Sequence, residues 1–258
     1  MKFLYTNYPK QYGKFLYFKN RLLTYPKLIL MKMGINVYFG SKDQDKWVIE
    51  DIFKFKTNGY FVDLAATNGL FENNTYVLEK KYNWTGIAIE PNEKFYKRLI
   101  KIRNCKTFNV VILSNESEVN FLEDGPTGGV IGEEFDNNYL KRSLIIKEKS
   151  NKILKKKSRS LKSILQEANA PKEIDYLSLD VEGAETSVLK NFPFHDFIFL
   201  CMSIERPSNE LNKILFKNDY IFVKNFKADT FYVHKRLLNK FHQKINFEKF
   251  EQIPQKSW

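Results

Sequence analysis

The sequence YFVDLAATNG, residues 60–69, is the stretch that decides the fold. Its first five residues form a short apolar run, and the small and polar residues after it end at Gly69. A run of this length bounded by turn residues is typical of a buried strand. Residues 73–82 follow with apolar side chains at helical spacing. Strand, turn and helix in this order form the first unit of a parallel α/β sheet.

The same alternation continues toward the C-terminus. A helix through residues 95–102 follows the second strand. The remaining strands are predicted at residues 86–90, 107–113, 174–181, 197–204, 220–226 and 230–234, the last two as an antiparallel hairpin. We therefore predict a Rossmann-like α/β fold, with a mostly parallel seven-stranded sheet, an antiparallel C-terminal strand and helices on both faces.

Three further segments have other patterns. Residues 44–56 predict an amphipathic helix that leads into the first strand. Residues 114–135 alternate weakly and hold four glycines, which favours a hairpin and a mobile loop that acts as a lid. Residues 147–168 are rich in lysine, with a run at 155–157, and predict a helix with one solvated face.

The length of 258 residues suits one substantial α/β domain with an added segment. We expect a basic extension at residues 1–40, the domain at 41–236 and a basic, aromatic tail at 237–258. No apolar run in the sequence approaches the length of a membrane span. Cys105 and Cys201 lie far apart in or beside apolar runs, so we expect free thiols and a reducing, cytoplasmic location.

The net charge of +12 bears on two kinds of anionic partner, nucleic acid and a membrane surface. Clustered basic residues suit nucleic acid, but only seven of the 42 are arginine, and a lysine excess beside abundant Asn, Ile and Phe is typical of AT-rich coding. Nucleic acid is therefore not the favoured partner. Residues 1–40 mix lysine with apolar side chains and hold no acidic residue. Such a stretch could lie on an anionic membrane, dock a partner, or form a helical arm packed on the domain.

Acidic residues mark the ends of three predicted parallel strands. They are Asp63 in the loop before Gly69, Glu90 after the second strand, and the segment DVEGAE at residues 180–185. Ligands of open α/β sheets bind at these strand ends, and a carboxylate there can accept hydrogen bonds from ribose hydroxyls. A single such acid is often only a helix N-cap, but three in order predict a nucleoside-containing cofactor. The absence of G-x-G-x-x-G weighs against NAD.

Four blocks of the sequence carry a family resemblance. They are FVDLAATNG at 61–69, NT at 74–75 with LE at 78–79, WTGIAIEPN at 84–92, and DYLSLDVEGAE at 175–185. Together with Ser41 and the pair at 44–45, they resemble the FkbM family of class I S-adenosylmethionine-dependent methyltransferases. The similarity spans about residues 41–235 and is most specific in the last block.

The resemblance implies S-adenosylmethionine as cofactor and methyl transfer to a hydroxyl of a sugar, glycan or related small molecule. It places the cofactor on the loop after the first strand, the ribose on Glu90, and the adenine near Asn109 and Val110. The implied cofactor residues are Asp63, Leu64, Ala65, Asn68, Gly69, Asn74, Thr75, Glu90, Pro91, Asn109, Val110 and Asp180. The family commonly has Gly at the position of Ala65, Asn at that of Thr67, and often an acid at that of Asn68.

Methyl transfer to a hydroxyl needs alignment and a base. Asp180 is the first candidate, either as that base or as a ligand of a divalent metal that lowers the hydroxyl pKa. Glu182, Glu185 and Glu205 could share the role, although Glu185 also suits a structural contact from a helix start. His234 could serve only if its strand reaches the pocket, and a lone histidine in a strand is more often structural.

Two other functions compete with this one. Residues 191–194, NFPF, faintly resemble the N-P-P-F/Y motif of enzymes that methylate amino groups in nucleic acid, but the second position differs and the motif comes too late after Asp180. A non-catalytic binding protein that has lost the cofactor is the third hypothesis, motivated by Ala65, Thr67 and Asn68. The basic surface would suit an anionic or nucleotide-linked sugar as acceptor.

Overall fold

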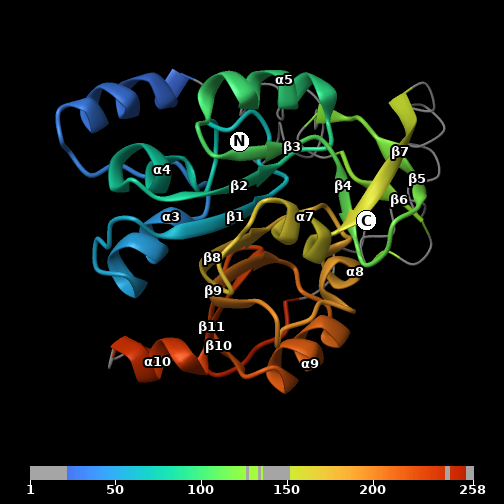
Figure 1. Ribbon diagram of the computed structural model, residues 1–258. Coiled ribbons are helices and arrows are strands. Elements are labelled where there is room, and N and C mark those ends of the chain that lie inside the picture. The colour runs from blue at the N-terminus through green and yellow to red at the C-terminus, as the bar shows by residue number, and fades with distance from the viewer. Residues whose placement is uncertain (1–21, 126–127, 133–134, 136–151, 242–244, 254–258) are drawn as a thin grey trace, which may run out of the picture.

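The computed structural model describes residues 22–125, 128–132, 135, 152–241 and 245–253 (Figure 1). Within these residues the chain forms a seven-stranded sheet and a smaller four-stranded sheet. The large sheet runs in the order β10-β11-β9-β8-β1-β2-β3. Its strands are β1 (Tyr60–Leu64), β2 (Thr85–Ile89), β3 (Lys106–Phe108), β8 (Glu173–Leu179), β9 (Ile198–Glu205), β10 (Tyr220–Phe226) and β11 (Asp229–His234).

Strand directions in the large sheet confirm the predicted α/β fold. β1 pairs in parallel with both β2 and β8, and β9 continues the parallel set. The last strand, β11, runs antiparallel between β9 and β10. Nearly every position of the central strands is buried, because helices cover both faces of the sheet.

Two groups of helices form the outer layers (Figure 1). One face packs against α7 (Leu161–Glu167), α8 (Glu185–Leu189) and α9 (Asn209–Lys217). The other packs against α3 (Gln44–Lys46), the π-helical segment η1 (Trp47–Ile52), α4 (Tyr76–Tyr82), α5 (Glu93–Ile102) and α10 (Lys235–Phe241). The helix predicted at residues 44–56 therefore ends at Ile52, and the next turn holds Lys54 and Phe55 at positive φ.

The smaller sheet corrects two predictions. Residues 107–113 are not one strand: β3 stays in the large sheet, and the chain then leaves it to form β4 (Val111–Leu113). The lysine-rich segment is not one helix either, because residues 153–160 form β7 (Ile153–Ser160) and only α7 is helical. β7 lies between β4 and β5 (Glu118–Leu122), and β5 pairs with β6 (Val130–Ile131).

Two lysines of the run form ion pairs with acidic side chains on β5 and just after it. Lys155 and Glu118 form an ion pair of 2.7 Å across β7 and β5, and Lys156 reaches Glu123 at 2.9 Å. The hairpin predicted within residues 114–135 is confirmed by the β5–β6 pairing. Of the segment predicted as a hairpin and lid, residues 126–127 and 133–134 lie outside the described residues, as do residues 136–151 after it.

The described parts of both ends pack on the large sheet. Residues 22–32 form a helix whose side chains Leu28 and Met31 contact the core beneath α4 and η1. Near the C-terminus, the amide of Glu248 donates to the carbonyl of Val223 (2.8 Å). None of the helices in the described part of the chain is both long and apolar enough to cross a bilayer.

Candidate active site

The candidate site lies at the carboxyl ends of the parallel strands. The chain runs outward from β1 through β2 to β3 and returns on the other side of β1 as β8. Loops that leave β1 and β8 therefore diverge, which is where open α/β sheets bind ligands. Two cavities adjoin here, and Leu64, Ala65, Thr67 and Phe95 line both of them.

The loop after β1 has a strained backbone. Ala65 has φ 63° and Thr67 has φ 48°, left-handed values that glycine and asparagine adopt more easily. The amide of Ala66 donates to the carbonyl of Ile89 (2.9 Å), and that of Gly69 donates to Ala66 (2.9 Å), so the turn is held on both sides. The strain therefore falls on the two positions where the FkbM pattern commonly has Gly and Asn.

Asp63 is buried at the end of β1 and held by its neighbours. Its Oδ2 accepts hydrogen bonds from the hydroxyl of Thr75 (2.7 Å) and the side-chain amide of Asn73 (2.9 Å). Nη1 of Arg103 lies 4.0 Å from the same oxygen. Burial raises the pKa of Asp63, although Arg103 and these hydrogen bonds oppose the rise. Asp63 lines the second cavity, whereas Thr75 is fully buried and supports it from behind.

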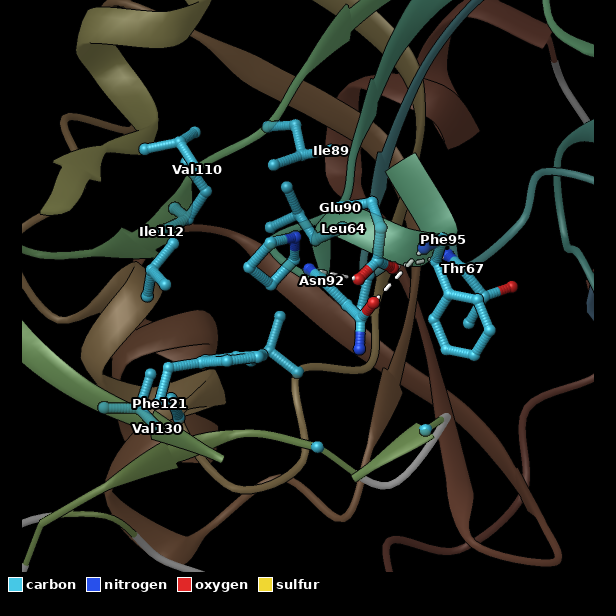
Figure 2. A pocket seen from close by; sticks show the side chains of 17 residues that line it. Leu64, Thr67, Ile89, Glu90, Asn92, Phe95, Val110, Ile112, Phe121 and Val130 are labelled. Carbon is cyan, nitrogen blue, oxygen red and sulfur yellow. Dashed lines mark hydrogen bonds between the residues drawn. The ribbon is translucent and has the colours of Figure 1, made fainter. Parts of the chain in front are cut away.

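Glu90 follows β2 with its carboxylate between two backbone amides. Thr67 donates to Oε2 (2.7 Å) and Asn92 to Oε1 (2.8 Å), as Figure 2 shows. Burial raises the pKa of Glu90 to about 7, against the lowering effect of these amides. The two amides fix the carboxylate where the cavity wall meets the end of β2.

An apolar cavity of about 550 Å³ lies beside Glu90 (Figure 2). Ile89 and Val110 line it from the large sheet and the break after β3, and Ile112 lines it from β4. Phe121 and Val130, from β5 and β6, line it from the small sheet. An apolar lining with a carboxylate at one edge suits a nucleoside.

Pro91 and Asn109 shape the edge of this apolar cavity. The side-chain amide of Asn109 donates to the carbonyls of Glu90 (2.7 Å) and Pro91 (3.2 Å), so it ties the end of β2 to the point where the chain leaves the large sheet. Pro91 itself lines the cavity. Pro91 thus lies on the cavity wall, whereas the side-chain amide of Asn109 donates to backbone carbonyls and is not among the residues that line the cavity.

The second cavity, of about 1100 Å³, is polar and holds the acidic residues predicted for catalysis. Carboxylate oxygens of Asp180, Glu182 and Glu205 lie within 4.8 Å of one another. Burial, followed by the charge of Glu205, raises the pKa of Asp180 well above its usual range. Glu182 has a left-handed backbone (φ 58°) in the turn after β8. The structure thus brings three of the five candidate catalytic side chains together.

Lys42 lies among these acids and was not predicted from the sequence. Its Nζ lies 2.6 Å from Oδ1 of Asp229 and 3.3 Å from Oε1 of Glu205. Burial opposes protonation, but the charges of Asp180, Asp229 and Glu205 raise the pKa of Lys42. A permanent cation therefore balances part of the negative charge in the cavity.

Other predicted residues support the loops around the second cavity. Asn68 lines the cavity, and its Oδ1 accepts from the amide of Phe71 (3.0 Å). Asn74 lines it too and donates to the hydroxyl of Ser178 (2.9 Å). Gly69 packs beneath α5, where a Cβ atom would lie 2.7 Å from Leu99.

Glu185 holds the turn after β8 rather than lining either cavity. Its Oε1 accepts from the amides of Val181 (2.9 Å) and Gly183 (3.2 Å). The side chain is buried, and burial raises the pKa of Glu185 to about 8. The structural contact expected for this residue as an alternative is thus the one observed.

His234 does not reach the site, which corrects its proposed role as a base. β11 runs antiparallel to β9, and Asp229 at its start pairs with Glu205. His234 therefore ends β11 at the opposite edge of the sheet, where its ring packs edge-on against Tyr220 at 4.9 Å between centroids. Its Nδ1 accepts from the amide of Arg236 (3.0 Å).

Two residues of the candidate site, Phe121 and Lys42, were not predicted from the sequence. Phe121 alternates with Val119 in a segment assigned to a hairpin, but nothing local says that the hairpin faces a cofactor slot. Lys42 gives no signal, because its partners Glu205 and Asp229 lie 163 and 187 residues away along the chain.

Residues 63–235 match the model of the methyltransferase FkbM domain. The chain belongs to the FkbM methyltransferase family. It is thus a methyltransferase, and membership implies S-adenosylmethionine as methyl donor. No curated protein matches the sequence significantly. Among solved structures, a TehB-like SAM-dependent methyltransferase from Corynebacterium glutamicum ATCC 13032 Kitasato is similar at 7% identity and a TM-score of 0.38, over 84% of this chain and 98% of that one.

Proposed function

We propose that this FkbM-family protein transfers a methyl group from S-adenosylmethionine to a hydroxyl of a sugar, glycan or related small molecule. The observation that carries the proposal is the pair of adjoining cavities, one apolar beside Glu90 and one polar around Asp180. They share the end of β1 as a common wall. Donor and acceptor can therefore meet at one strand end.

The donor fits the first cavity by shape and hydrogen bonding. Glu90 offers a carboxylate to the ribose hydroxyls, and its two amide contacts keep it from turning away. Val110, Ile112 and Phe121 provide apolar surfaces for the base. Asp63, at the wall of the polar cavity, is available to the amino-acid part. When bound, S-adenosylmethionine supplies an electrophilic methyl group on a sulfonium.

Asp180 is the proposed base. In the displacement, the acceptor oxygen bonds to the methyl carbon as the carbon–sulfur bond breaks, and the hydroxyl proton moves to Asp180. Burial and the charge of Glu205 raise the pKa of Asp180, which makes its ionised form a stronger proton acceptor. The positive charge of Lys42 reduces the electrostatic repulsion among the carboxylates of Asp180, Glu205 and Asp229. An ionised carboxylate at this position is therefore less unfavourable.

A divalent metal belongs to the same proposal as a second way to activate the hydroxyl. Carboxylate oxygens of Asp180, Glu182 and Glu205 are the ligands that Mg²⁺ prefers, and their separation of at most 4.8 Å fits one ion. Such an ion would lower the pKa of a bound hydroxyl. Methyl transfer that persists unchanged after exhaustive chelation would remove the metal from the proposal.

Two structural observations weigh against the competing functions. Phe192 and Phe194 of the NFPF segment are buried, with rings 5.0 Å apart, so they do not form an exposed stacking surface for a nucleic-acid base. Ala65, Thr67 and Asn68 still build a closed loop whose Thr67 amide reaches Glu90. The departures that motivated a non-catalytic protein therefore leave intact the loop that positions Glu90, the residue that we propose binds the ribose.

The test is transfer of label from S-adenosylmethionine carrying a labelled methyl group to a panel of sugars, nucleotide-linked sugars, glycans and RNA. The proposal expects label on a hydroxyl-bearing small molecule or glycan, and a loss of at least about 100-fold in rate with Asp180→Asn. The exposed Asp196→Asn serves as the matched control. Label found only on RNA would overturn the proposed acceptor class, and equal rates for Asp180→Asn and wild type would overturn the base.

Both cysteines in the described chain are free, which agrees with the reducing, cytoplasmic setting that we propose for this reaction.

A further inference from the structure

The helix at residues 22–32 is apolar on two opposite sides. Its inner side packs on the domain through Leu28 and Met31, and Lys27 donates to the carbonyl of Tyr38 (2.6 Å). Its outer side exposes large apolar side chains, led by Ile29 (61%) and Met33 (69%). The full set of exposed apolar residues here is Leu22, Leu23, Tyr25, Ile29, Leu30, Met33 and Ile35.

Helical spacing shows that this exposure is one continuous stripe. Leu22, Tyr25 and Ile29 follow one another at intervals of three or four residues, so they lie on one side of the helix, and Met33 comes four residues later, just after the helix ends. A helix on the surface of a globular protein normally exposes polar side chains to solvent. A helix that is apolar on all sides is normally buried against other apolar surfaces. Something apolar is therefore expected to cover this stripe.

A basic face lies beside the stripe. Lys94, Lys97, Arg98 and Lys101 are exposed on α5 at positions i, i+3, i+4 and i+7, which puts all four on one side of that helix. Tyr25 of the N-terminal helix lines one groove together with Arg98 and Lys101. In Figure 1 the two helices lie along the same end of the molecule, in dark blue and green.

We propose that this helix and the basic face of α5 bind an anionic lipid surface, the helix with its apolar stripe in the headgroup region and α5 with its cations on the headgroups. Aliphatic side chains flanked by lysine and arginine are the pattern of interfacial helices. The net charge of +12 for the whole chain adds long-range attraction.

Two other occupants fit less well. A second copy packed about a two-fold axis would cover the apolar stripe but would leave the cations of α5 without an anionic partner supplied by that same surface. A nucleic acid would pair with the cations and could stack on Tyr25, but it would gain little from the aliphatic Leu22, Ile29 and Met33.

The helix also borders the proposed acceptor cleft. Leu23 and Lys27 line a groove with Ser41 and Glu72, and both of these last residues line the acidic cavity as well. A docked helix would therefore lie next to the access to the polar cavity. Lipid binding itself goes beyond methyl transfer and needs neither donor nor acceptor, so the two proposals fail separately.

The test is sedimentation of the full chain with vesicles of phosphatidylcholine alone or mixed with phosphatidylglycerol. We expect binding to the anionic vesicles that weakens with added salt, and little binding to neutral ones. Ile29→Glu with Met33→Glu should weaken binding about tenfold or more, as should Arg98→Glu with Lys101→Glu.

Matched controls separate this surface from general charge and apolar exposure. Lys213→Glu with Lys217→Glu makes the same charge change on exposed positions of α9, and Leu154→Glu changes an apolar side chain that is 44% exposed on β7. Both should keep wild-type binding, and thermal unfolding should show every variant folded. The proposal is overturned by equal binding to neutral and anionic vesicles, by equal losses in the controls, or by light scattering in which Ile29→Glu with Met33→Glu converts a dimer to a monomer.

Discussion

Ala65 and Thr67 show how single residues carry the strain of the cofactor loop. Both have positive φ, which costs an L-residue about 1 kcal/mol or more relative to glycine. Ala65→Gly should therefore raise the free energy of unfolding by about 1 kcal/mol in urea denaturation. Ala66→Gly, at a neighbour without positive φ, should lower it. Equal losses in the two variants would contradict the strain.

Glu90 links cofactor binding to pH. Its pKa of about 7 means that the carboxylate is largely protonated at pH 6 and ionised at pH 8. Ribose hydroxyls donate best to the ionised form, so affinity for S-adenosylhomocysteine should rise between pH 6 and pH 8 by up to about tenfold per pH unit below the pKa. Glu90→Gln should bind more weakly and lose this dependence in calorimetric titrations. A wild-type affinity that does not change over this range would contradict the assignment.

At the scale of elements, the small sheet completes the proposed donor site. Phe121 and Val130 line the apolar cavity from β5 and β6, outside the seven-stranded core. Phe121→Ala should weaken S-adenosylhomocysteine binding by about tenfold or more, because it removes a large apolar surface from the slot. Asn120→Ala, at the adjacent exposed position of β5, should bind as wild type does. Similar losses in both variants would mean that the hairpin matters only for folding.

The elements also show where sequence patterns suffice. β1, β2, β8 and β9 are short, mostly apolar runs at the predicted places, because a strand buried on both faces is apolar at most positions. β7 was missed because lysine favours helices in isolation, and the acids that hold Lys155 and Lys156 in a sheet lie more than 30 residues earlier along the chain. The break between β3 and β4 falls at Asn109 and Val110, and one polar residue between two apolar stretches is too weak a signal to divide the predicted strand.

The residues of the candidate site also fall into those that the sequence could predict and those that it could not. Asp63, Glu90 and Asp180 could be predicted because each follows a buried strand, and parallel strands bring their ends together. β11 runs antiparallel, as predicted, so its first residue Asp229 lies near the site and its last residue His234 lies far from it. Lys42 enters the site from a segment before β1, which no strand-end argument reaches.

For the whole molecule, buried acids determine how stability depends on pH. Burial raises the pKa of Asp45 to about 6, of Glu90 to about 7 and of Glu185 to about 8. The folded state therefore holds more protons than the unfolded state between about pH 4 and pH 8, and stability falls as pH rises through the folded pKa values. Each such carboxyl contributes a slope of up to about 1.4 kcal/mol per pH unit.

Thermal unfolding measured from pH 6 to pH 9 should accordingly show a falling midpoint. Glu185→Gln removes one of the titrating groups and should flatten the fall, because its amide oxygen can still accept from the amides of Val181 and Gly183. Stability that rises over the same range, in wild type and variant alike, would be inconsistent with buried protonated acids.

The most direct test of the central claim, that the cavity beside Glu90 holds the methyl donor, is calorimetric titration with S-adenosylhomocysteine at pH 8. Wild type should bind, and Glu90→Ala should bind at least about tenfold more weakly while remaining folded. Glu210→Ala, on the exposed side of α9, should match wild type. Wild type that does not bind, or Glu90→Ala that binds as tightly as wild type, would contradict the account.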